Sequence, residues 1–185
     1  MKYPIVIALP FLMLADYYLT LLSTVLKDKK LSKYVIFEEW ELNPRFQEAI
    51  NQKKLINTKH LFSVGLISFL AIFLTELSDL SQEFINFILG VFLIKYSVII
   101  GGHISNIFWS CYAIKRENQI RGQIRYTYEA TLFSSMPIYL LPIFPLIVIY
   151  IYTRSFFVLG GICGILLLMI TFLRFFKMMK KKKKY

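Results

Sequence analysis

Long apolar stretches separated by short polar segments dominate the chain. A bilayer's hydrocarbon core needs roughly 20 consecutive helical residues, and five stretches are apolar over about that length or more. The pattern predicts an all-α fold, a helical bundle in which residues 1–185 form a single transmembrane domain. The predicted spans are residues 3–26, 60–77, 84–114, 127–153 and 156–176.

The only long segment between spans is loop 27–59, and it carries a helix signal of its own. Asn43 can cap a helix, and Pro44 suits the first helical position because its missing N–H would have no partner there. Apolar residues follow at helical spacing. The pattern predicts a short amphipathic helix over residues 44–55 that lies on the inner face of the membrane.

The positive charge of the chain is distributed unevenly between the two sides that five spans define. The chain is 57% hydrophobic and has a formal net charge of +11. Loop 27–59, loop 115–126 and the end of the chain from Arg174 hold 8, 4 and 7 Lys and Arg residues, which is 19 of the 22; the other side holds 2. Basic residues favour the cytoplasmic side. We therefore expect a multi-pass protein of the cell's inner (plasma) membrane, with the N-terminus outside and the C-terminus in the cytoplasm.

The C-terminal segment 177–185 is rich in lysine. It is either a topology determinant or a surface that attracts anionic lipids of the inner leaflet, at about 1 kcal/mol per basic residue. No nucleic-acid reader motif accompanies it, so we expect no nucleic-acid partner.

Cys111 and Cys163 lie in different predicted spans and form no zinc pattern. We expect no metal and no cofactor.

Two charged side chains interrupt the apolar spans. Asp16 lies thirteen residues into the first span and Lys95 eleven residues into the third, and both spans run from outside to inside. A charge at that depth costs at least ~2.5 kcal/mol, so we expect Asp16 and Lys95 to pair or to share a water-filled cavity. Such a pair is either structural or part of a proton or ion relay. Thr20 extends a polar stripe along the face of Asp16.

The segment GGHISN carries His103 and Asn106 near the inner end of the third span. Gly101 and Gly102 permit close approach of another backbone. His103 is either a packing residue or a functional group, and its spacing from other ligand types does not favour metal binding.

Spans four and five carry further breaks and small residues. Prolines should kink or break span four at three positions, Pro137, Pro142 and Pro145. Glu129 lies near the inner interface, at about the depth of His103. Gly160 and Gly164 have the small-x-x-x-small spacing that favours close helix contact within or between chains, which is compatible with a homo-oligomer.

These motifs resemble a group of uncharacterised small prokaryotic polytopic membrane proteins. In those proteins a D-x-x-x-T helix precedes an E-x-N-P turn, as Asp16 and Thr20 precede ELNP at residues 41–44. GGHISN and IRGQI are similar to their G-x-H-x-x-N and I-x-G segments, although this chain has Gly102 where members carry a basic residue. The resemblance implies no known activity. It implies that five polar residues belong together: Asp16, Glu41, Asn43, His103 and Asn106.

Two classes of function remain open. The first is a channel-like or transporter-like unit, alone, as a homo-oligomer or as a subunit of a membrane complex. Besides Asp16 and Lys95, its candidate pathway residues are Thr20, Asn43 and Asn106. The second is a membrane enzyme that acts on a lipid-like substrate at a cytoplasmic-facing site. Its candidate catalytic residues are His103, Glu41 and Glu129. No nucleophile elbow, zinc triad or phosphate loop supports the second class, so we expect the first.

Overall fold

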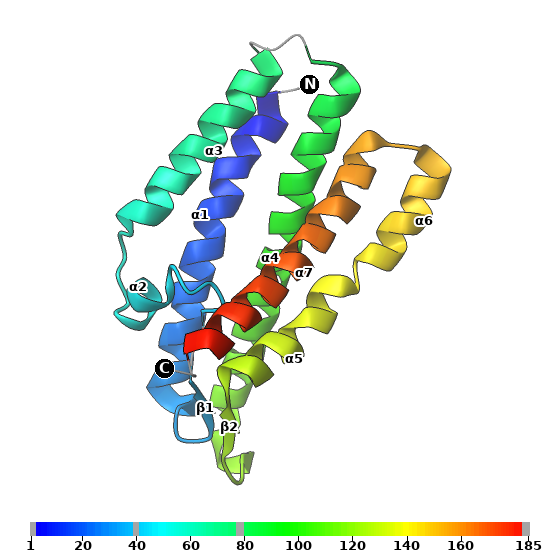
Figure 1. Ribbon diagram of the computed structural model, residues 1–185. Helices are drawn as coiled ribbons and strands as arrows, with labels where there is room; N and C mark the ends of the chain where they lie inside the picture. Colours follow the sequence, from blue (N-terminus) through cyan, green and yellow to red (C-terminus); the bar gives the residue numbers. More distant parts are fainter. Residues whose placement is uncertain (1–2, 39–40, 77–79, 183–185) are drawn as a thin grey trace.

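In a computed structural model, five helical segments long and apolar enough to cross a membrane form the body of the part of the chain that it describes (Figure 1). The structure describes residues 3–38, 41–76 and 80–182. The helices are α1 (Tyr3–Leu26), α2 (Gln47–Asn51), α3 (Thr58–Glu76), α4 (Gln82–Lys115), α5 (Tyr128–Leu140), α6 (Ile143–Thr153) and α7 (Phe156–Lys182). A π-helix, η1 (Lys27–Leu31), extends α1, and a 3-10 turn, η2 (Glu117–Gln119), follows α4. The predicted all-α bundle is confirmed.

The fourth predicted span is two helices rather than one. α5 ends at Leu140 and α6 begins at Ile143, with Pro142 between them. Pro142 and Pro145 have no N–H to donate to the carbonyls one turn earlier, so a continuous helix would lose two bonds at this point. Pro137 lies inside α5. The expected proline break therefore occurs at residues 141–142.

The last helix is longer than the sequence pattern predicts. α7 continues through residues 177–182, which were expected to form a separate basic tail. Lysine is a good helix former, and the helix is already established by the apolar residues before it. Residues 183–185 lie outside the described residues.

α4 is the central helix of the bundle, and α1 and α7 pack on it rather than mainly on each other (Figure 1). α3 packs against α1, while α5 and α6 lie against α7. One apolar cluster joins α1, α3 and α4 around Leu9, Met13 and Leu89. A second joins α5 and α7 around Leu132 and Phe172.

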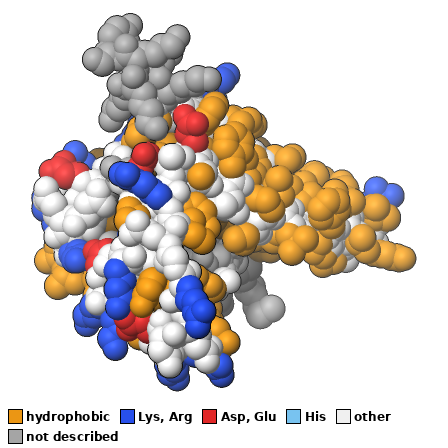
Figure 2. Space-filling view, turned by 90° about the horizontal axis from the view of Figure 1, so that it is seen from below, with side chains coloured by type: hydrophobic (Ala, Val, Ile, Leu, Met, Phe, Trp, Pro, Cys, Tyr) orange, Lys and Arg blue, Asp and Glu red, His pale blue; other side chains and the backbone are white. Residues whose placement is uncertain are grey.

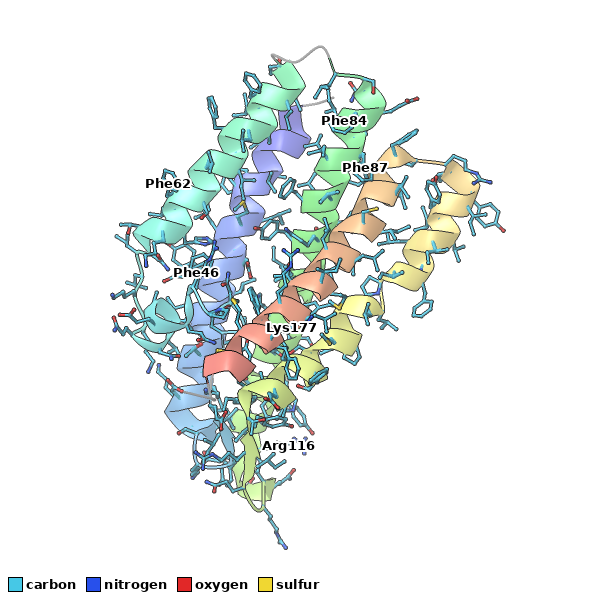
Figure 3. The ribbon with its side chains drawn as sticks, in the orientation of Figure 1. Phe46, Phe62, Phe84, Phe87, Arg116 and Lys177 are labelled. Carbon is cyan, nitrogen blue, oxygen red and sulfur yellow. The ribbon has the colours of Figure 1, made fainter. Side chains whose placement is uncertain are left out.

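Glycines bring the backbones of α4 and α7 into direct contact. A Cβ atom on Gly160 would collide with the carbonyl oxygen of Phe87, and one on Gly164 with that of Val91. Figure 3 labels Phe87 where the two helices meet. Gly160 and Gly164 therefore make their close contact within the chain. Gly101 is different, because nothing lies within 4 Å of a Cβ placed there. The expected packing role of Gly101 is thus wrong within this chain.

The loops that follow α1 and α4 meet at one end of the bundle, which we call the basic end (residues 27–57 and 116–127). Two short strands pair there in parallel, β1 (Val35–Phe37) and β2 (Ile124–Tyr126). The rings of Phe37 and Tyr126 stack 4.9 Å apart. The Lys33 ammonium forms an ion pair with Glu117. The sequence pattern did not predict this link between the two loops.

The helix expected over residues 44–55 is shorter, because α2 covers only Gln47–Asn51. Its Ile50 side chain is fully buried against Tyr17 and Leu21 of α1. α2 is therefore held by the bundle rather than by a membrane surface alone.

The basic end and the arm that contains α6 differ in surface chemistry. Figure 2 views the molecule from the basic end and shows Lys and Arg side chains gathered beside an arm covered by hydrophobic ones. The arm on the right of that view contains α6, none of whose residues is buried. Apolar exposure over a whole helix is the composition that a lipid environment favours.

Candidate functional site

The candidate site is centred on a contact between α1 and α4. The Nε2 atom of His103 lies 2.8 Å from Oδ1 of Asp16. The His103 side chain is 14% exposed and the Asp16 side chain 28% exposed, so the pair is largely enclosed. Asp16 lies more than ten residues after the start of α1, and His103 more than ten residues after the start of α4. The pair is therefore a polar contact inside the bundle.

Thr20 completes this contact and determines the direction of its hydrogen bonds. Its hydroxyl donates to the carbonyl oxygen of Asp16 at 2.9 Å, and lies 3.1 Å from Nε2 of His103. The single hydroxyl proton is used on the carbonyl, so the threonine oxygen accepts from His103. Nε2 of His103 therefore carries a hydrogen directed at Asp16 and Thr20. Nδ1 is the ring nitrogen left to gain or lose a proton.

The direct ion pair predicted between Asp16 and Lys95 is not formed, and the alternative, a water-filled cavity that both share, stays a prediction. Among the described residues, no carboxylate oxygen lies within 4 Å of the Lys95 ammonium. Its Nζ instead lies 5.1 Å from the ring centre of Phe92 and 4.7 Å from that of Tyr96. Asp16 still interacts electrostatically with Lys95, but from a greater distance than it contacts His103.

The direction of helical side chains explains this exchange of partners. In an α-helix the side chains lean toward the N-terminus. α1 and α4 run in the same direction (Figure 1). The long Lys95 side chain therefore extends away from Asp16, whereas His103, eight residues later, leans back toward it. The prediction compared only the distance of each residue from its helix start and ignored both the stagger of the helices and this lean.

A turn at residues 41–46, which we call the Glu41 loop, brings a second carboxylate toward the pair. Oε1 of Glu41 accepts a hydrogen bond from the backbone N–H of Asn43 at 2.6 Å. Oδ1 of Asn43 accepts from the backbone N–H of Arg45 at 3.1 Å. Short polar side chains that bond the backbone two residues away stabilise such turns. Asn43 therefore shapes the Glu41 loop.

The Glu41 loop is anchored to the bundle on two sides. The Tyr128 hydroxyl of α5 donates to the carbonyl of Leu42 at 2.8 Å, and the Leu42 side chain packs against the α5–α7 apolar cluster. On the other side Phe46 meets the His60 ring edge-on at 5.5 Å. Figure 3 labels Phe46 beside α1 and the start of α3. These contacts fix the loop to α5 on one side and to α3 on the other.

The environment of Glu41 changes its acidity. Burial, and to a smaller extent the negative charge of Asp16, raise the pKa of Glu41 to about 7. The hydrogen bond from Asn43 and the nearby His103 ring act in the opposite direction. A carboxyl group with this pKa exchanges protons near neutral pH. Because Glu41 interacts with both members of the pair, the three side chains form one electrostatic unit.

Two other predicted site residues form no hydrogen bond or ion pair with this unit. The side chains of Asn106 and Glu129 make none with any residue that the structure describes. Gly102 does face the centre of the bundle, since a Cβ there would lie 3.1 Å from the ring of Tyr139. Asp16 and Glu41 both interact electrostatically with Tyr139.

Tyr139 is a residue that sequence reasoning missed. The chain has 12 Tyr and 17 Phe, so a single aromatic residue in an apolar helix gives no signal.

His60 has a structural role: its Nε2 lies 3.1 Å from the carbonyl oxygen of Met13, and its ring stacks on Tyr17. In the described part of the chain, no three or more His, Cys, Asp and Glu side chains gather as a metal site.

Comparisons with known proteins add no further constraint on this site. No family model, no curated protein and no solved structure matches the chain.

Proposed function

We propose that the protein is a proton-conducting, transporter-like unit of the cell's plasma membrane, working alone, as a homo-oligomer or within a larger membrane complex. The observation that carries this proposal is the Asp16–His103 contact at 2.8 Å inside the helical bundle. Charges at membrane depth are costly and mark ion or proton pathways. A histidine hydrogen-bonded to a carboxylate is an arrangement that can relay a proton.

The orientation follows from the distribution of basic residues. Of the 22 Lys and Arg residues, 19 belong to the loops at the basic end and to the end of the chain from Arg174. The positive-inside rule assigns this end to the cytoplasm, with the N-terminus outside. The lysines at the end of α7 then meet the inner leaflet, where each contributes about 1 kcal/mol of attraction to anionic lipids.

Glu41 supports a cytoplasmic route for the proton. It belongs to a loop of the basic end, and its pKa of about 7 suits exchange with the cytoplasm. From Glu41 a proton passes to Nδ1 of His103, where the Asp16 carboxylate stabilises the resulting imidazolium. Lys95 and Tyr96, nearer the outside on α4, lie within the electrostatic range of Asp16 and continue the polar path.

A membrane enzyme is the alternative, and one observation favours it. A carboxylate that orients a histidine is the arrangement of a general base. In hydrolytic triads, however, the nucleophile contacts the ring nitrogen opposite to the carboxylate. Here Thr20 and Asp16 contact the same nitrogen, Nε2. Thr20 is therefore not an activated nucleophile, and the enzyme would have to activate water toward a lipid-like substrate.

The proposal is tested with the full-length protein in liposomes that contain a pH-sensitive dye, with the membrane potential clamped by potassium and valinomycin. We expect proton flux above that of protein-free vesicles, and a loss of at least about tenfold in Asp16→Asn and in His103→Gln, because each removes a group that holds the proton. Glu83→Gln is the matched control, since it removes an exposed carboxylate at the opposite end of α4.

Two results would contradict the proposal. One is a wild-type flux no greater than that of empty vesicles. The other is an Asp16→Asn flux equal to that of Glu83→Gln. Under the enzyme alternative, His103→Ala would instead abolish turnover of a lipid-like substrate while the protein stays folded.

A further inference from the structure

Lys95 is a membrane-depth charge that the proton pair leaves without an ionic partner. It lies on α4 eight residues before His103, which is about 12 Å along the helix axis. Its ammonium rests between the rings of Phe92 and Tyr96, at 5.1 and 4.7 Å from their centres. The described residues provide no carboxylate oxygen within 4 Å of it. The aromatic faces attract the cation but carry no counter-charge.

The side chains around Lys95 are suited to a negatively charged ligand. Asp16, the acidic group that acts on Lys95, is itself held by His103 and Thr20. The Tyr96 side chain, whose ring centre lies 4.7 Å from the ammonium, carries a hydroxyl group. A hydroxyl donor beside an ammonium is a common way to bind an anion.

Resting on the proposed function, we propose that Lys95 binds a small monovalent anion that crosses the membrane together with the proton. The shared chemistry is a single negative charge that accepts hydrogen bonds. An inorganic halide and an organic monocarboxylate both have it, and the experiment below distinguishes them.

Charge balance gives the physical reason for coupling the two ions. A proton taken up at the Asp16–His103 contact adds one positive charge inside the bilayer, which is unfavourable. A monovalent anion beside Lys95 adds one negative charge and cancels it. The empty and the fully loaded states then carry the same net charge, so the two ions cross together at lower cost than the proton alone.

Direct binding tests the anion site without requiring transport. The purified full-length protein is dialysed at fixed ionic strength, in sulfate buffer, against radiolabelled chloride in one arm and radiolabelled benzoate in the other. We expect saturable binding in at least one arm. Lys95→Met should weaken it at least tenfold, and Lys95→Arg should retain it because the positive charge is kept. Lys59→Met, which removes an exposed lysine at the start of α3, should leave binding unchanged.

The outcomes separate this inference from the proposed function. Binding that is absent in both arms, or equal in wild type and Lys95→Met, overturns the inference, and size-exclusion profiles of each variant establish that it is folded. In liposomes, proton flux that is indifferent to a gradient of the bound anion also overturns it, while proton conduction stands. Lys95-dependent binding in a protein that moves no protons supports the anion site and contradicts proton conduction.

Discussion

At the scale of single residues, the site consists of groups that are far apart in the sequence and close in space. Asp16 and His103 are 87 residues apart and in direct contact. Glu41 lies in a loop outside both helices and interacts electrostatically with Asp16 and with His103.

The acidity of Glu41 leads to a prediction about stability and pH. Its pKa is raised from 4.5 to about 7 in the folded protein. The folded state then binds more protons than the unfolded state between these values, so this group's contribution is complete below pH 4.5 and is lost as the pH rises toward 7. The contribution is about 3 kcal/mol at most. In Glu41→Gln, the free energy of unfolding should fall less between pH 5 and pH 8 than in wild type.

Chemical denaturation in detergent micelles at several pH values measures this difference. Subtracting the two curves removes the titration of His60, which both proteins share. Glu48→Gln is the matched control, because Glu48 is an exposed carboxylate in the nearby helix α2. Parallel curves for wild type and Glu41→Gln would show that Glu41 titrates normally.

The important polar residues could be recognised from the sequence, but their partners could not. Asp16, Lys95 and His103 stand out because charged and polar groups are rare in apolar spans. The resemblance also grouped Asp16, Glu41 and His103, which interact in the structure, with Asn43, which bonds Glu41, and with Asn106, whose side chain bonds none of them. The choice of His103 over Lys95 depends on helix stagger and side-chain lean, and a one-dimensional pattern contains neither.

At the scale of elements, the helices were predictable because length and apolar composition determine them locally. The paired strands β1 and β2 were not, since each has three residues and the two lie about 90 residues apart in the chain. A strand of that length has no periodic signature of its own. The Glu41 loop follows β1 in the chain, and the pairing of β1 with β2 could not be predicted. The position of Glu41 was therefore the part of the site that was hardest to predict from the sequence.

The backbone contact between α4 and α7 predicts the effect of adding one methyl group. Gly160→Ala would force a Cβ against the Phe87 carbonyl, and the helices would have to separate. We expect a loss of about 1–3 kcal/mol in the free energy of unfolding. Gly101→Ala is the matched control, because its Cβ would meet open space and alanine favours the helix. Equal stability of the two variants in thermal unfolding would show that α4 and α7 are not in backbone contact.

At the scale of the whole molecule, apolar and polar contacts lie in different interfaces of the bundle. The α4–α7 interface is tightly packed, whereas the α1–α4 interface carries the polar contact between Asp16 and His103. The Glu41 loop, which interacts electrostatically with both residues, belongs to the basic end and is anchored by α5. The central claim is therefore that Asp16 has its functional partner in His103 and not in Lys95.

A pair of double-mutant cycles tests this claim most directly. The free energy of unfolding is measured in mixed micelles for Asp16→Ala, His103→Ala, Lys95→Ala and the two double variants that contain Asp16→Ala. We expect a coupling energy of about 1–3 kcal/mol between Asp16 and His103, because residues in one hydrogen-bonded network are not additive. We expect a clearly smaller coupling between Asp16 and Lys95. A larger coupling to Lys95 than to His103, or none to His103, would contradict the account.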